Sequence, residues 1–67
     1  GSNLDYWKII EEEINSKKGW ISLDDIVKKY EIPKWVADLW LKNRKQYFNV
    51  KWILDGGNRF VVYVKKK

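Results

Sequence analysis

Residues 23–48 read LDDIVKKYEIPKWVADLWLKNRKQYF, and this stretch decides the fold of the chain. A short helix, a tight turn and a longer helix fit it best. Pro33 suits the first turn of the longer helix, because a missing N–H costs nothing there. Pro33 also biases Ile32 away from helical backbone angles, so the short helix should end near Tyr30. The stretch therefore predicts helices at 23–30 and 33–46, joined by a turn.

Each of these helices has an apolar side that can face a core. The apolar residues on these sides are Ile26, Val27, Tyr30, Val36, Leu39, Trp40 and Tyr47. Ile32 should enter the core from the turn between the helices. Trp40 lies at the centre of the apolar arc of the longer helix. We therefore expect Trp40 to be largely buried.

A further helix is predicted before this stretch, at 4–17, with Asn3 as its N-cap. Its apolar side consists of Tyr6, Trp7, Ile10 and Ile14. Glu11 should face away from the core, whereas Glu13 falls inside the apolar arc and could pair with Lys17. Gly19 could end this helix, because glycine is common just past the last helical residue.

A short β-prone run, Trp20-Ile21-Ser22, follows the first helix and predicts a small strand. Ser22 and Asp25 then resemble a capping box, with Ser22 as the N-cap and Asp25 three residues into the helix. The second helix should therefore begin at residue 23.

After Phe48 the apolar period changes, and two β-rich runs, 49–54 and 59–64, flank Gly56-Gly57, which predicts a hairpin. A two-residue turn at these glycines would pair Trp52 with Val61. The face toward the helices would then consist of Val50, Trp52, Val61 and Tyr63, and the other face of Lys51, Ile53, Phe60 and Val62. A shift of one residue stays open, and it would exchange the faces.

The 67 residues allow one domain at most, and they include no Cys and no His. Disulfides, the common metal sites and nucleophile–base pairs therefore lack their usual residues, and no phosphate-binding glycine motif is present. We expect no enzyme active site and no cofactor. No apolar run approaches the ~20 residues of a membrane span, and the composition is compatible with a cytoplasmic protein.

The expected organisation is one domain at 3–64 and a basic, frayed tail at 65–67. Gly1 and Ser2 resemble a cloning scar, so the domain should come from a longer protein.

The net charge of +5 is unevenly distributed. Residues 1–32 hold five Lys against seven Asp or Glu, a balance of −2, whereas residues 33–67 hold nine Lys or Arg against two Asp, a balance of +7. The basic half begins where the helix at 33–46 begins. This asymmetry indicates a polyanionic partner for the C-terminal half, although a solvated basic surface is the alternative.

The order of helix, short strand, helix, turn, helix and hairpin resembles the winged helix-turn-helix family over residues 3–64. The matching segments are 20–22 for the small strand, 23–30 for the second helix, 33–46 for the recognition helix and 48–64 for the wing. The resemblance implies an α+β fold, with the third helix in the DNA major groove. Glu31 departs from the family pattern, because glycine is frequent at that point of the turn. The composition also resembles small domains of thermophilic archaea and their mobile elements, in replication proteins such as helicases or in transcription regulators.

The candidate DNA-binding residues are Lys34, Trp35, Asp38, Leu41, Lys42, Lys45, Lys51, Asn58 and Arg59. Lysines on the polar arc of the third helix can pair with phosphates or reach guanine O6 and N7. Asp38 could accept from cytosine N4 or pair with a lysine four residues away. Trp35 could be a packed aromatic or could stack an unpaired base.

The hairpin residues could touch the DNA backbone or the minor groove, where arginine fits a narrow groove. Asn58 could instead only complete the turn, and Arg59 could only protect a strand edge. Arg44 points toward the core on a helical wheel, so we expect its long side chain to reach the hairpin or a phosphate.

Two functions compete. The first is a double-stranded DNA-binding module, and the second is a protein-interaction domain within a larger replication or transcription assembly. The high aromatic content and the apolar hairpin favour the second. Binding of single-stranded nucleic acid or of RNA is a third alternative. Salt dependence separates the first two, because DNA binding weakens steeply with salt and an apolar interface does not.

Overall fold

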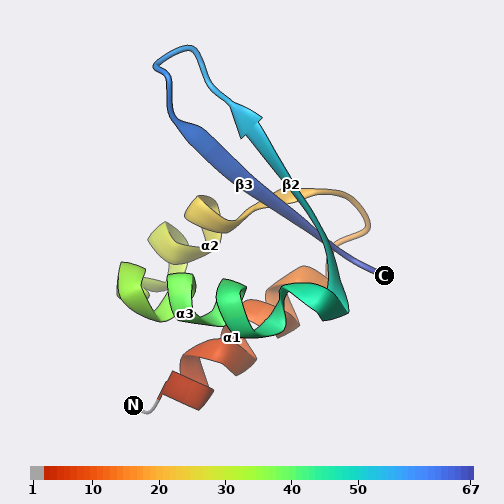
Figure 1. Ribbon diagram of the computed structural model, residues 1–67. Helices are drawn as coiled ribbons and strands as arrows, with labels where there is room; N and C mark the ends of the chain where they lie inside the picture. The colour runs from red at the N-terminus through yellow and green to blue at the C-terminus, as the bar shows by residue number, and fades with distance from the viewer. Residues whose placement is uncertain (1–2) are drawn as a thin grey trace.

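The structure is a computed structural model that describes residues 3–67 (Figure 1). These residues form three helices and a three-stranded antiparallel sheet, so the expected α+β class is confirmed. The elements are α1 (Asn3–Asn15), β1 (Ile21–Ser22), α2 (Leu23–Tyr30), α3 (Lys34–Arg44), a 3₁₀ turn (Lys45–Tyr47), β2 (Phe48–Leu54) and β3 (Phe60–Lys66). The sheet order is β1-β3-β2, which is compatible with a winged helix. The first two residues, interpreted above as a cloning scar, lie outside the described part.

α1 ends two residues earlier than predicted, at Asn15. The Ser16 hydroxyl donates to the Glu13 carbonyl (2.9 Å), and this bond satisfies one of the carbonyls that a helix end leaves free. Gly19 is not a left-handed residue that ends the helix, because no glycine in residues 3–67 has a positive φ. Asn3 is itself helical, so α1 begins one residue before the predicted start.

α2 has the predicted bounds and the predicted cap. The Ser22 hydroxyl accepts a hydrogen bond from the Asp25 N–H (3.3 Å). At the other end Glu31 takes the left-handed conformation, with φ 51°, and its N–H donates to the Val27 carbonyl. The turn therefore keeps the backbone geometry for which glycine is favoured, although a glutamate occupies the position.

α3 starts one residue later than predicted, because Pro33 is its N-cap and accepts from the Val36 N–H (3.0 Å). The regular helix ends at Arg44, and the predicted last turn is instead the 3₁₀ turn that leads into β2. Pro33 thus sets the start of α3 as expected, within one residue.

The β2–β3 hairpin has a register one residue away from that of a two-residue turn. Trp52 pairs with Val62 rather than with Val61, and the connection runs through residues 55–59. The Asp55 carboxylate organises this loop by accepting from the Gly57 N–H (2.7 Å), and Asn58 takes a left-handed φ of 61°.

The register shift exchanges the two faces of β3 and leaves those of β2 as predicted. The side toward the helices consists of Val50, Trp52, Leu54, Phe60, Val62 and Val64. Val61 and Tyr63 lie on the opposite side, which corrects the prediction. β3 also continues through Lys65 to Lys66, so most of the predicted basic tail is strand and not frayed.

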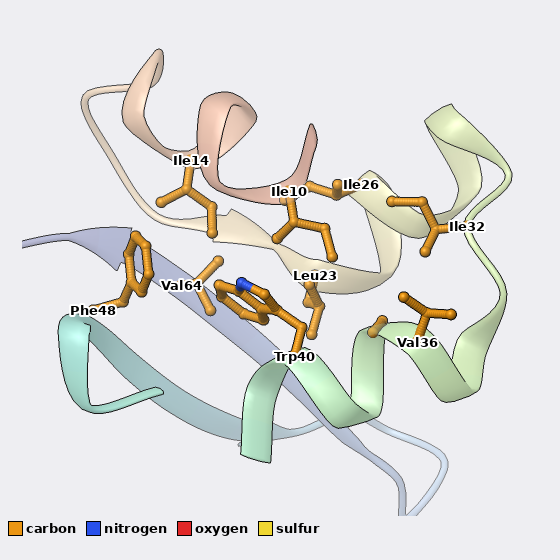
Figure 2. Close-up of a cluster of buried hydrophobic side chains, with 10 residues drawn as sticks. Ile10, Ile14, Leu23, Ile26, Ile32, Val36, Trp40, Phe48 and Val64 are labelled. Carbon is orange, nitrogen blue, oxygen red and sulfur yellow. The ribbon is translucent and has the colours of Figure 1, made fainter. Parts of the chain in front are cut away.

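The core lies between the helices and the inner side of the sheet (Figure 2). Trp40 has 0% of its surface exposed, as predicted, and its ring lies 5.4 Å from that of Phe48. The remaining core residues are Ile10, Ile14, Leu23, Ile26, Ile32, Val36, Ala37 and Val64. Leu39 and Tyr47, which were assigned to the apolar side of α3, are exposed because Trp40 and Val36 set the rotation of this helix.

Candidate nucleic-acid interface

Most of the DNA-binding residues predicted on the third helix lie on the outer side of α3 and of the 3₁₀ turn after it. Burial of Val36 and Trp40 fixes the rotation of α3. The opposite side consequently exposes Lys34, Trp35, Asp38, Lys42 and Lys45. Leu41 lies at the edge of this side and is half-buried. α3 and the 3₁₀ turn thus present three lysines and one aspartate to solvent on one side.

A groove of about 560 Å³ adjoins this side of α3 and is bounded by α2, α3 and the hairpin. Its lining residues are Leu23, Asp24, Val27, Lys28, Lys34, Ala37, Asp38, Leu41, Arg59, Phe60 and Val62. Four predicted site residues are among them, from segments that are distant in the sequence. Lys28 was not among the predicted site residues. Its place on the polar side of α2, opposite Ile26, could have indicated that it is exposed near the groove.

Asp38 is not paired with its helical neighbours. Within residues 3–67 no ion pair joins its carboxylate to Lys34 or Lys42, although their spacing favoured such a pair. The Asp38 carboxylate is exposed beside these lysines, so it can accept a hydrogen bond from a ligand.

Arg59 lies in the loop before β3, and its guanidinium has two acidic neighbours. Nη2 is 3.2 Å from the Asp24 carboxylate of α2, and Nε is 4.0 Å from that of Asp55. Asp24 was not among the predicted site residues, because it lies 35 residues from Arg59 in the sequence. Both pairs are exposed, so each holds the guanidinium weakly and a phosphate can compete for it.

Lys51 lies on a different surface from the α3 residues, on the face of β2 that was predicted for it. It pairs with Tyr63 across the sheet, and its ammonium lies 4.3 Å from the centre of the Trp20 ring, on the side of the sheet away from the helices. Asn58 is at the tip of the hairpin, where its left-handed backbone completes the loop.

Arg44 holds α3 to α1 and reaches neither the hairpin nor the solvent on the outer side of α3. Its Nε and Nη2 donate to the two carboxylate oxygens of Glu11, at 2.8 and 3.0 Å. The Trp40 indole N–H donates to the same carboxylate (2.9 Å). The hydrogen bond from Arg44, with a smaller contribution from Trp40, lowers the pKa of Glu11 against the opposing effect of burial. The expectation that Glu11 faces away is therefore wrong.

Glu13 makes the equivalent contact with α2. Its carboxylate accepts from the Lys29 ammonium (2.8 Å) and from the Tyr30 hydroxyl (2.6 Å). Both hydrogen bonds lower the pKa of Glu13, and the bond from Lys29 has the larger effect. The predicted pair with Lys17 is absent from the ion pairs of the described residues. Glu13 is thus a buried carboxylate with partners on a different helix.

Comparisons with protein-family models, with curated proteins and with solved structures gave no match. None of the helices in residues 3–67 combines the length and the apolar character that crossing a bilayer requires.

Proposed function

We propose that this chain is a double-stranded DNA-binding module of the winged helix-turn-helix type. The observation that supports the proposal is the outer side of α3 and of the 3₁₀ turn after it, where Lys34, Lys42 and Lys45 are exposed together while the opposite side of α3 is packed into the core. In this arrangement α3 enters the major groove, which accepts one α-helix. The 11 residues of α3 span roughly 16 Å, enough to follow the groove across several base pairs.

The lysines of α3 have two types of acceptor available in the groove. Lys42 and Lys45 are near its C-terminal end and can reach phosphates, which fix the position of a protein on DNA. Lys34 and Asp38 are one helical turn apart near the start of α3, and both line the groove. A lysine there can donate to guanine, and the Asp38 carboxylate can accept from cytosine N4.

The hairpin would supply a second point of attachment. It projects beyond the helices (Figure 1), and its loop brings Arg59 to the groove that α3 borders. Arg59 would exchange its exposed partners Asp24 and Asp55 for a phosphate or for a narrow minor groove. Lys28 of α2 lines the same groove and adds a cation.

The test is a fluorescence-anisotropy titration with one duplex at three salt concentrations. About four to six cations would contact phosphate, so log K should fall with log salt at a slope of about −4 to −5. Replacing Lys42 and Lys45 with Ala should reduce the magnitude of this slope by about 1 to 2. The matched control replaces Lys8 and Lys18, two exposed lysines in α1 and the following loop, and removes the same charge.

The control should keep a steeper slope than the α3 variant. If the parent does not bind duplex at low salt, or if both double variants have the slope of the parent, α3 is not the DNA-binding element.

A specific observation favours the alternative function, protein interaction within a larger replication or transcription assembly. Trp52, Leu54 and Phe60 share one side of the hairpin and are 49%, 53% and 63% exposed. Exposed apolar side chains grouped in this way are typical of protein-binding surfaces. A partner that binds there should show little salt dependence, and replacing Leu54, which does not line the groove beside α3, with Ser should weaken it without affecting the binding of duplex.

A further inference from the structure

The side of the sheet away from the helices carries a cluster of two aromatic rings and two lysines. The cluster consists of Trp20, Lys51, Tyr63 and Lys65. Lys51 is the cross-strand partner of Tyr63, and Lys65 follows two residues later in β3. The Lys51 ammonium is 4.3 Å from the centre of the Trp20 ring and 5.9 Å from that of Tyr63. The Lys65 ammonium is 5.9 Å from the Trp20 ring.

Among the residues that the structure describes, the charges of this cluster have no acidic partner. None of the ion pairs among residues 3–67 includes Lys51 or Lys65. The contacts of the two ammonium groups in the described part of the chain are with the π faces of the rings, and at an exposed site such a contact contributes about 0.5–1 kcal/mol. An anion that approaches the sheet therefore finds two cations that can exchange an aromatic neighbour for a phosphate.

Trp20 is available for stacking. It precedes the two-residue strand β1 at the edge of the sheet, and 41% of its surface is exposed. An aromatic ring on a sheet surface is where unpaired bases stack in several nucleic-acid-binding folds, and lysines beside the ring follow the backbone. A duplex cannot use this arrangement, because its bases are already stacked on one another. The requirement for a ring and adjacent phosphates thus selects an unpaired strand.

We propose that this side of the sheet binds a single strand of nucleic acid, with one base on the Trp20 indole and neighbouring phosphates on Lys51 and Lys65. The site is separate from the outer side of α3, because its residues face away from the helices. The inference does not depend on duplex binding by α3.

The test is a titration of a labelled 12-residue oligothymidylate, which cannot form a duplex with itself. Replacing Trp20 with Ala should weaken its binding about 5- to 150-fold, the range for loss of one stacked base. Trp20→Phe keeps a ring and should retain most of the affinity. Replacing Lys51 and Lys65 with Ala should reduce the magnitude of the salt slope by about 1.4, since each contact contributes about 0.7 for single strands.

The matched control is Trp35→Ala, which removes the exposed tryptophan of α3 and should leave the affinity for the oligothymidylate unchanged. Melting curves show whether each variant is folded. If Trp20→Ala does not fold, the comparison of Trp20→Phe with the lysine double variant decides the matter, because an unchanged salt slope overturns the proposal.

Three further results would refute it: no binding of the oligothymidylate by the parent at low salt, parental affinity in folded Trp20→Ala, or a loss confined to Trp35→Ala. Duplex titrations of the same variants separate the two sites. The Lys42 and Lys45 double variant should lose duplex affinity and keep oligothymidylate binding, so failure of one proposal does not imply failure of the other.

Discussion

Trp40 is the side chain on which the core depends most, and its removal should be the most damaging single change in α3. The ring is 0% exposed, packs 5.4 Å from the ring of Phe48 and donates to Glu11. Trp40→Ala should cost about 3–5 kcal/mol, the range for a large aromatic residue truncated in a core. A 67-residue domain has a total stability of roughly 3–10 kcal/mol, so this variant should be partly or fully unfolded at 25 °C.

A second substitution at the same position separates packing from hydrogen bonding. Trp40→Phe keeps an aromatic ring and removes the indole N–H. Glu11 would still be held by two bonds from Arg44, so no carboxylate is left without a partner. The cost should therefore be about 1–2 kcal/mol, near the lower end for a hydrogen bond to a charged group.

The assay is urea unfolding followed by far-ultraviolet circular dichroism, because tryptophan fluorescence changes with the substitutions themselves. The control is Trp35→Ala, which truncates the same residue type on the same helix where 60% of it is exposed. Its free energy of unfolding should change by less than about 0.5 kcal/mol. Equal losses in the two alanine variants, or a parental midpoint for Trp40→Ala, would show that α3 is rotated relative to the core.

Three further outcomes can be checked. The contacts that lower the pKa values of Glu11 and Glu13 stabilise the fold above the ordinary glutamate pKa of about 4.3, and this stability is lost as the pH falls through the lowered values. Glu13→Gln should therefore be less stable than the parent at pH 7, with a difference that shrinks in acid unfolding curves; an unchanged difference at pH 2 would contradict this. Arg59→Ala should weaken duplex binding several-fold and leave the melting temperature nearly unchanged, since its ion pairs are exposed; unaltered affinity would confine the interface to α3. Glu31→Gly should raise the free energy of unfolding by about 0.5–1 kcal/mol, because glycine adopts φ 51° without the steric cost of a Cβ, and a lower melting temperature would refute this.

Features set by local interactions could be predicted from the sequence. The bounds of α2 follow from the Ser22 cap and from Pro33, which act within a few residues of the helix ends. The burial of Trp40 follows from the helical period. The set of exposed lysines on α3 follows from the same period, since the side opposite Trp40 must face solvent.

Features set by side chains that are distant in the sequence could not be predicted. Glu11 and Arg44 are 33 residues apart, and no helical or strand period relates them. The hairpin register depended on the Asp55 carboxylate, which organises a longer loop than a glycine pair requires. Because the observed register differs from the predicted one by one residue, the two sides of β3 are the reverse of those predicted. The contact between Lys51 and Trp20 could not be predicted, because the sequence pattern does not show that these two residues lie side by side.

The two carboxylates of α1 have a consequence for how the molecule opens. Glu11 holds α3 and Glu13 holds α2, from positions two residues apart on one helix. If α1 detached, both helices would lose their partners together, and Ile10 and Ile14 would leave the core. Amide hydrogen exchange in α2 and α3 should consequently occur through one shared opening event, with a single free energy, rather than through fraying of either helix alone.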